Sequence, residues 1–514
     1  MRPVFHKILT AIRGRFASRS HGKLLSALSL CLLLLTISVF IRSLRVERRS
    51  APYAALLEAL PDVGAGSPAI VMSAIRGEFP QDVARLLADS TAVSPGGASG
   101  VTLFLPIFDT AEAMSMVITE RAAGLVMYGA FTLTLEENDA LRSGELPEEW
   151  KRHFVMPELL RTHRKGLFQL RANNVGLPIY LGVEDEAVFV ADSILDADRI
   201  MEVRDGIAPG MKRKWPEDEG WGGHVYLSDG GVLHAMMSGG DEFPTPERAL
   251  EIEISWKTSD DLRETRAKWR INGAEHILGR AFSGALRGHD WSRDDLFIPD
   301  PLVLSLGVNM PNPGRNAQSL PSAFRYLAEY LRKMGLKASE VQALMTGQAA
   351  ISLGGRTQLL WFDLPGIVLD LPGRGETSFK LVDKFWTELF AGTEPSPIDG
   401  YSKGGVTNLP FTVIAAADED KAVIGLIAPD VDQNLEVKEL LAGATSAAAW
   451  IYVDFPRLGA SLAEVPALGA MIYEDEESPI DEESANNLKD AMKSLGRVFV
   501  ICESASSGSA MCYY

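Results

Sequence analysis

Apolar and polar residues alternate along much of the chain in short runs that predict β-strands. Examples are FTLTL (131–135), EIEISW (251–256) and IVLDL (367–371), in which apolar residues recur at every second position. A period of two places the apolar side chains on one face of a strand. Antiparallel sheets commonly bury one face in this way. We therefore expect mostly antiparallel sheet with helices packed on it, an α+β fold.

A second periodicity, of about 3.6 residues, predicts helices between the strands. The segment AFRYLAEYLRKM (323–334) places Phe324, Leu327, Leu331 and Met334 on one face and is followed by Gly335, a common helix terminator. Residues 136–163 are expected to be mostly helical, with breaks at prolines.

The order of the predicted elements repeats, which predicts two tandem modules. Four pairs of segments correspond: 68–74 with 301–307, 130–135 with 366–371, 177–183 with 409–415, and 222–228 with 448–454. Near-constant offsets of 233, 236, 232 and 226 residues favour a duplication. Alternatively, any two α+β stretches can be aligned by eye, and the helical inserts at 109–118 and 136–146 have no clear partner. The expected modules are 68–271 and 301–514, joined by a helix and linker at 272–300.

An uncharged run of eighteen residues, Leu24–Ile41, precedes these modules. As a helix it would measure about 27 Å, close to the thickness of a bilayer core. Six basic residues lie in the tail 1–23 and four follow the run, which favours a cytoplasmic N-terminus. The sequence therefore predicts an uncleaved transmembrane signal anchor, a stem at 42–67 and a periplasmic or extracellular body held at the inner membrane. A cleaved signal peptide and a buried core helix are the alternatives.

Charge separates the two ends of the chain. The whole chain has a net charge of −18, and residues 1–49 carry ten Lys/Arg and one Glu, or +9, so residues 50–514 carry −27. Phosphate contacts need Lys and Arg, so this excess of acid excludes electrostatic binding of nucleic acid by the body. The expected partners are the lipid bilayer, through the anchor, and an envelope protein or a small ligand.

The two cysteines of the body lie close together in the sequence. Cys502 and Cys512 flank a Ser/Gly-rich turn and are symmetric about Ser507. A regular hairpin centred on Ser507 would place them opposite each other, near disulfide distance. We therefore predict a Cys502–Cys512 disulfide in an oxidising compartment. Metal binding is the alternative, although two thiols supply only half of a zinc site.

Motif searches assign no catalytic, cofactor-binding or metal-binding residue. The chain has neither G-x-S-x-G nor H-E-x-x-H. The segment LPGRGETSFK (371–380) has glycines before a predicted helix but no P-loop lysine, which favours a turn and helix cap. Asp430, Asp432 and Asn434 begin like a calcium loop that then lacks its glycine and glutamate. The acidic block 473–484 lacks the calcium-loop spacing, and Lys212–Lys214 are expected to form a solvated face.

These observations favour a non-enzymatic binding or scaffold protein of the cell envelope. The alternatives are a carrier or sensor of an apolar ligand or lipid, and an extracytoplasmic hydrolase with a dispersed site. An enzyme should show a cleft with converging polar groups, and a carrier should show an apolar cavity. A scaffold should instead expose an apolar patch.

Overall fold

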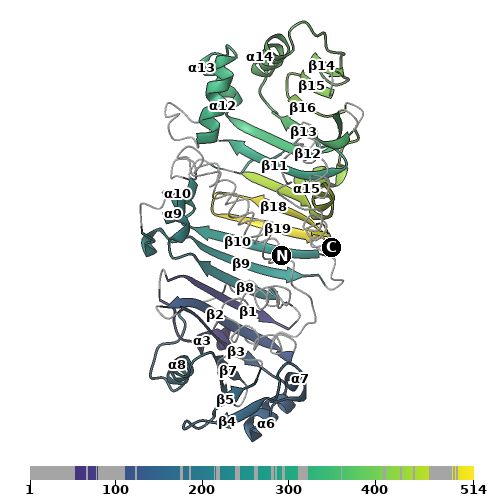
Figure 1. Ribbon diagram of the computed structural model, residues 1–514. Coiled ribbons are helices and arrows are strands. Elements are labelled where there is room, and N and C mark those ends of the chain that lie inside the picture. The colour runs from purple at the N-terminus through teal and green to yellow at the C-terminus, as the bar shows by residue number, and fades with distance from the viewer. Residues whose placement is uncertain are drawn as a thin grey trace, which may run out of the picture. The chain divides into compact units, whose positions relative to one another are not determined.

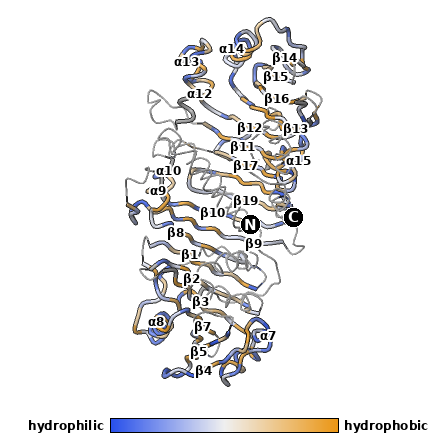
Figure 2. Tube along the Cα trace, in the orientation of Figure 1, coloured by the Kyte–Doolittle hydropathy of each residue, from blue (hydrophilic) through white to orange (hydrophobic). Residues whose placement is uncertain are grey.

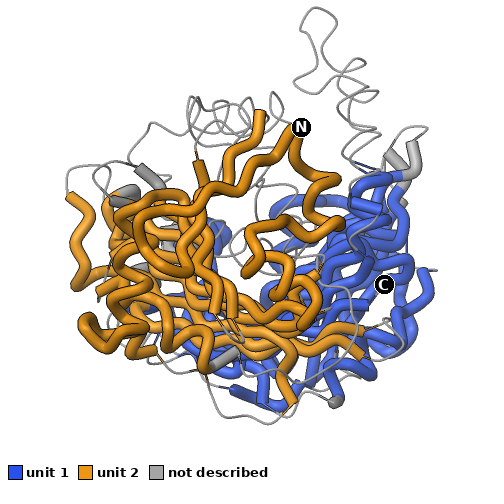
Figure 3. Tube along the Cα trace, turned by 90° about the horizontal axis from the view of Figure 1, so that it is seen from below, with its two compact units in different colours: residues 1–33, 274–514 blue, residues 34–273 orange. Residues whose placement is uncertain are grey.

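The chain forms two compact units that divide between Gly273 and Ala274 (Figure 3). The computed structural model describes most of residues 53–513 and leaves out 1–52, 79–109, 311–321, 462–488 and several shorter segments. Among the described residues, unit 2 ends at Gly273 and unit 1 begins at Ala274. Each unit contains antiparallel strands and a hydrophobic core of its own. The division falls just after residue 271, where the first module is expected to end.

Unit 2 is built on an antiparallel sheet. Backbone hydrogen bonds join its strands in the order β4-β5-β6-β7-β3-β2-β1-β8-β9-β10. The strands are β1 (Ala69–Ile75), β2 (Ala113–Arg121), β3 (Gly124–Thr132), β4 (Glu158–Arg161), β5 (Leu167–Arg171), β6 (Ile179–Val183), β7 (Val188–Ala191), β8 (Gly223–Ser228), β9 (Glu251–Thr258) and β10 (Glu264–Asn272).

Short helices cover parts of this sheet. They are α3 (Tyr53–Glu58), α6 (Leu135–Ser143), α7 (Glu148–Lys151), α8 (Ile194–Arg204), α9 (Val232–Met237) and the 3₁₀ turn η1 (Pro246–Arg248). Helix α6 begins where the Thr134 hydroxyl accepts from the backbone N–H of Glu137, and it ends at Gly144, whose φ of 89° is left-handed. Leu56 and Leu57 of α3 pack into the core of the unit, and this burial holds the helix on the sheet.

Unit 1 is also an antiparallel sheet. Its strands follow the order β14-β15-β16-β13-β12-β11-β17-β18-β19. They are β11 (Leu302–Met310), β12 (Gly347–Leu359), β13 (Phe362–Asp370), β14 (Lys403–Asn408), β15 (Thr412–Ala417), β16 (Ala422–Leu426), β17 (Ala449–Asp454), β18 (Arg497–Cys502) and β19 (Ser507–Tyr513). The helices are α10 (Ala274–Leu278), α12 (Ser322–Lys333), α13 (Ala338–Leu344), α14 (Glu376–Lys384) with the π-helical turn η4 (Phe385–Leu389), and α15 (Leu435–Gly443).

The two units share one strand order across nine strands. The counterparts are β1 with β11, β2 with β12, β3 with β13, β5 with β14, β6 with β15, β7 with β16, β8 with β17, β9 with β18 and β10 with β19. The shared order includes the same long connection: β1 pairs with both β2 and β8, as β11 pairs with both β12 and β17. Strand β4 has no counterpart among the described residues of unit 1.

A buried pair of serines occupies the same place in both units. Ser73 of β1 faces Ser115 of β2 with 2.6 Å between the Oγ atoms, and Ser305 of β11 faces Ser352 of β12 with 2.7 Å. All four side chains are fully buried. In each pair one hydroxyl donates to the other, which supplies a partner that a buried polar group needs.

The units differ in what covers the other face of the sheet. In unit 1, Ile351, Ile367 and Leu426 lie on neighbouring strands and are 46%, 48% and 41% exposed. The serine pairs align the two units, with Ser352 in the place of Ser115. Following the strand registers from there, Ile351 corresponds to Met114 and Leu426 to Val190, and both of these residues of unit 2 are buried. The same strand order therefore has a covered face in unit 2 and a partly open aliphatic face in unit 1.

The predicted fold class is corrected in two respects. The described residues are mostly antiparallel sheet with few helices, and Figure 2 shows hydrophobic positions concentrated along the strands. Within residues 136–163, for example, only α6 and the four-residue α7 are α-helical, and β4 forms where helix is predicted. Helix α6 ends at Gly144, Pro147 directly precedes the first residue of α7, and β4, which follows Pro157, gains a hydrogen-bonded partner in β5.

The second correction concerns the transmembrane helix. In the part of the chain that the structure describes, no helix is both long and apolar enough to cross a membrane, so the predicted signal anchor is not supported. The segment Leu24–Ile41 that carried this prediction lies outside the described residues. The periplasmic placement of the body depended on that segment and stays a prediction.

A candidate ligand-binding groove on strands β9 and β10

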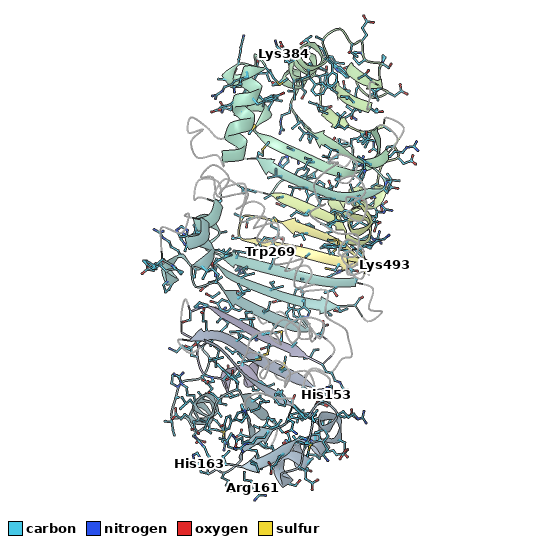
Figure 4. The ribbon with its side chains drawn as sticks, in the orientation of Figure 1. His153, Arg161, His163, Trp269, Lys384 and Lys493 are labelled. Atoms are coloured by element: carbon cyan, nitrogen blue, oxygen red, sulfur yellow. The ribbon has the colours of Figure 1, made fainter. Side chains whose placement is uncertain are left out.

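Strands β9 and β10 form a hairpin (Figure 1), and one face of this hairpin carries a row of exposed cations. Along β10 burial alternates strictly: Trp269 and its alternate neighbours are buried, while Arg266 and Lys268 are exposed. Figure 4 shows Trp269 on this strand. The alternation follows from the sequence ETRAKWRIN, because successive side chains of a strand point to opposite faces. The buried apolar positions fix the strand and leave its cations at the surface.

Two of these cations lie opposite each other across the hairpin. Arg266 pairs in register with Lys257 of β9, an arrangement that is destabilising for like charges. Glu264 offsets part of this repulsion, since its Oε1 lies 2.6 Å from the Arg266 Nε. Among the residues that the structure describes, neither Lys257 nor Lys268 has a carboxylate within ion-pair distance. Unpaired neighbouring cations in so acidic a chain mark the hairpin as a candidate site for anions.

Gly220 and Trp221 form the second wall of the site. The Lys268 Nζ lies 5.7 Å from the centroid of the Trp221 ring, within cation–π range. Gly220 has a φ of 103°, and a Cβ there would lie 3.3 Å from the Lys257 Nζ. Glycine is therefore favoured at 220 by the backbone conformation.

Together these elements enclose a groove of about 510 Å³. Its lining consists of Gly220, Trp221, Lys257, Thr258, Ser259, Glu264, Arg266 and Lys268. Three cations and one carboxylate give the lining a net charge of +2. The volume falls within the range of small-molecule pockets, about 300–1,000 Å³. The groove can therefore hold an anionic organic molecule.

A buried hydrogen-bond network supports the floor of the groove. Glu78 is 4% exposed, and its carboxylate accepts from both the backbone N–H and the hydroxyl of Thr258, each at 3.0 Å. The Thr258 hydroxyl also lies 3.0 Å from that of Thr265 on β10. Gly222 makes room for Glu78, because a Cβ there would lie 2.4 Å from the Glu78 Cγ. The network fixes the end of the hairpin from which Lys257 projects.

A serine and a histidine lie close together beside the groove but are buried. The His224 Nδ1 lies 2.7 Å from the Ser255 Oγ, and the Trp215 ring stacks on the imidazole at 5.2 Å. His224 is 1% exposed and Ser255 is 9% exposed. A nucleophile and its base must both reach the substrate within hydrogen-bond distance. Their burial under Trp215 favours a structural role.

The strongest perturbed ionisation among the described residues lies in unit 1, at Asp370. This side chain is 2% exposed; its Oδ1 accepts from the backbone N–H of Phe297 at 3.0 Å, and its Oδ2 has no hydrogen-bond partner. Burial raises the pKa of Asp370 to about 8, against the lowering effects of the Phe297 N–H and of Lys438 and Lys421. The pKa of Tyr401 is raised by burial and by the nearby Asp370. Asp370 does not line the groove.

The predicted disulfide is not formed. In the β18–β19 hairpin Cys502 lies opposite Gly508, because the turn is centred on Ala505 rather than Ser507. Cys512 is four residues further along β19, a separation of about 14 Å at 3.4 Å per residue. Bridged cysteines have Cα atoms within about 7 Å. Neither cysteine belongs to a disulfide, and the two thiols are held apart by the register.

The other sequence-derived candidates have structural roles or lie outside the description. Arg374, in the glycine loop before α14, is largely buried and donates to the carbonyls of Leu344 and Pro372. Asn434 caps α15 through a 2.9 Å bond from the Val437 N–H. The acidic block 473–484 and Asp430 lie outside the described residues.

Metal-binding clusters are also not seen in the described part. No group of three or more His, Cys, Asp or Glu side chains within it is placed to hold a metal ion. Figure 4 shows His153 and His163 well separated around β4 and β5.

Sequence reasoning did not find the groove. Alternation in ETRAKWRIN already places Arg266 and Lys268 on the exposed face of one strand, which was the available signal. The contribution of Lys257 depends on the hairpin register, and that of Trp221 on a loop far away in the sequence. Residues 212–214 were expected to be solvated, but the Arg213 guanidinium packs over Tyr226, with its Cζ 3.3 Å from the ring centroid.

Comparisons with known proteins add little. No protein-family model and no curated protein matches this sequence. Crystal form III of TP0453 is similar over 42% of this chain and 78% of its own, with 10% identity and a TM-score of 0.26. Crystal form IV covers 45% and 88%, with 12% identity and a TM-score of 0.25. Likeness at this level carries no conclusion about fold or function.

Proposed function

We propose that this protein is a non-enzymatic binding protein that holds an anionic small molecule in the groove on β9 and β10. The observation that carries the proposal is the pair of cations, Lys257 and Lys268, that have no carboxylate partner among the described residues and line a groove of about 510 Å³. A bound anion would relieve the repulsion between Lys257 and the opposite Arg266.

The two alternative functions have less support in the described residues. A carrier of apolar ligands needs a sizeable apolar cavity. The apolar pocket between β5–β7 and α8, with Leu167, Phe189 and Ile200 in its wall, has no room for a water molecule. A hydrolase would need a reachable nucleophile, and the Ser255–His224 pair is buried.

Isothermal titration calorimetry tests the proposal. A panel of sulfate, inorganic phosphate, citrate, benzoate and adenosine 5′-monophosphate is titrated into the full chain at low and high ionic strength. We expect at least one anion to bind at low salt and to weaken as salt screens the charges. The double variant Lys257→Gln/Lys268→Gln should lose about a hundredfold or more in affinity, since each of the two charge-assisted hydrogen bonds contributes about 1.5–3 kcal/mol.

The control is Lys165→Gln, which removes an exposed lysine of the same unit away from the groove. It should bind as the parent chain does. If no anion of the panel binds, or if the double variant and the control bind equally well, the groove is not a ligand site.

A further inference from the structure

We propose that the ligand of this groove is a phosphomonoester of a planar organic molecule, an inference that rests on the proposed function and specifies its ligand class. Two properties of the lining lead to it. One is the number of charges that converge on the groove, and the other is the aromatic wall beside them.

The charge of the lining matches a dianion better than a monoanion. Glu264 already neutralises one of the three cations through its contact with the Arg266 Nε, which leaves +2. A phosphomonoester carries a charge of about −1.5 to −2 at pH 7, whereas a carboxylate carries −1. Arginine and lysine are also the usual side chains for phosphate recognition. A monocarboxylate would leave about one positive charge of the lining uncompensated.

The positions of the charged atoms place the anionic group at one end. Lys257 and Arg266 share a rung, and the Lys257 Nζ lies near Gly220, which has no side chain to fill the space there. Lys268 lies one alternate position further along β10 and contacts the Trp221 ring. The phosphate therefore belongs beside the rung of Lys257 and Arg266, on the side of Lys268, so that both lysines face it, and the organic part extends along the Trp221 ring.

The size of the groove and the indole specify the organic part. A phosphate group alone would fill a small part of about 510 Å³, so the ligand carries a sizeable body. A planar ring system gains stacking energy on an aromatic side chain, as nucleic-acid bases do on protein aromatics. Trp221, in the groove wall, supplies such a surface.

The test compares four probes on the full chain by calorimetry: adenosine 5′-monophosphate, adenosine, inorganic phosphate and benzoate. We expect adenosine 5′-monophosphate to bind about tenfold or more tightly than each of the other three. Lys257→Gln should weaken it about tenfold and leave the weak binding of adenosine unchanged. Trp221→Leu should weaken it about tenfold but change the affinity for inorganic phosphate less than about twofold. Thermal unfolding confirms that each variant is folded.

Three outcomes overturn the inference. Tighter binding of benzoate than of adenosine 5′-monophosphate would refute the phosphate while leaving the proposed anion-binding function intact. Equal binding of adenosine 5′-monophosphate and inorganic phosphate, or equal losses for both in Trp221→Leu, would refute the planar group. A lack of binding by every anion would refute the proposed function as well. If Trp221→Leu is unfolded, the probe comparison on the parent chain and on Lys257→Gln still decides.

Discussion

Replacing Asp370 by Asn should stabilise unit 1 at neutral and alkaline pH and have little effect in acid. Burial raises the pKa of this carboxyl to about 8, compared with about 3.9 in an unfolded chain. Below a pH of about 4, the Asp370 carboxyl is protonated and neutral in both the folded and the unfolded chain. Between the two values the native state binds a proton that the unfolded state has released. Stability is therefore lost as pH rises from about 4 to about 8.

The size of the effect follows from the difference of about four pH units. Each unit corresponds to about 1.4 kcal/mol, so the loss reaches about 4 kcal/mol at pH 7 and about 5–6 kcal/mol above pH 8. Asparagine has nearly the same shape, keeps an oxygen that can accept from the Phe297 N–H, and does not titrate. The Asp370→Asn variant should therefore exceed the parent by several kcal/mol at pH 8 and by less than about 1 kcal/mol at pH 4.

Urea unfolding is monitored by hydrogen–deuterium exchange. Exchange in peptides from β13 reports the unfolding of unit 1 alone. The matched control is Asp399→Asn, an equal change of charge at an exposed aspartate of the same unit. It should show no comparable pH dependence. If Asp370→Asn differs from the parent by the same free energy at pH 4 and pH 8, the protonated buried carboxyl does not exist.

Three further predictions concern packing and the thiols. Ser305→Ala should cost unit 1 about 1–3 kcal/mol in denaturant unfolding, because it leaves the buried Ser352 hydroxyl without its partner. The double variant Ser305→Ala/Ser352→Ala should lose less stability than the two single variants lose in sum. A loss equal to that sum would contradict the pairing. Gly307→Ala should destabilise unit 1 by at least about 1–3 kcal/mol, because the new Cβ would lie 2.1 Å from the Trp450 Nε1. Unchanged stability would contradict this close packing. In protein denatured and alkylated without reduction, mass spectrometry should find label on both Cys502 and Cys512, whereas a linked peptide would contradict the register.

The sequence was informative where a local pattern decides the structure. Alternation located most of the strands, such as β9 and β10, and helical spacing at 323–334 corresponds to α12, which begins at Ser322. Local patterns were misleading where tertiary pairing decides. Residues 158–161 look helical in context, but they form β4 because β5 offers a hydrogen-bonding edge.

Contacts between strands, including those of the candidate groove, were missed because they depend on strand register. The cations of β10 were visible in the sequence, but their nearness to Lys257 depends on register, and register depends on where the turn falls. The register is also the reason that the disulfide prediction was wrong. The turn is centred two residues earlier than expected, which places Cys512 four positions away from the residue opposite Cys502. The Ser73–Ser115 contact had no signal in hydropathy, since a buried serine looks polar until its partner is known.

The serine pairs have a consequence for recognising distant copies of this architecture. Each hydroxyl is a hydrogen-bonding partner of the other, so losing one alone removes a hydrogen bond from a buried polar atom, whereas two linked substitutions replace both polar groups together. Copies that have drifted apart should therefore keep both hydroxyls or replace both together. Scoring opposite positions jointly, as pairs drawn from two neighbouring strands, should reveal kinship that position-by-position comparison overlooks.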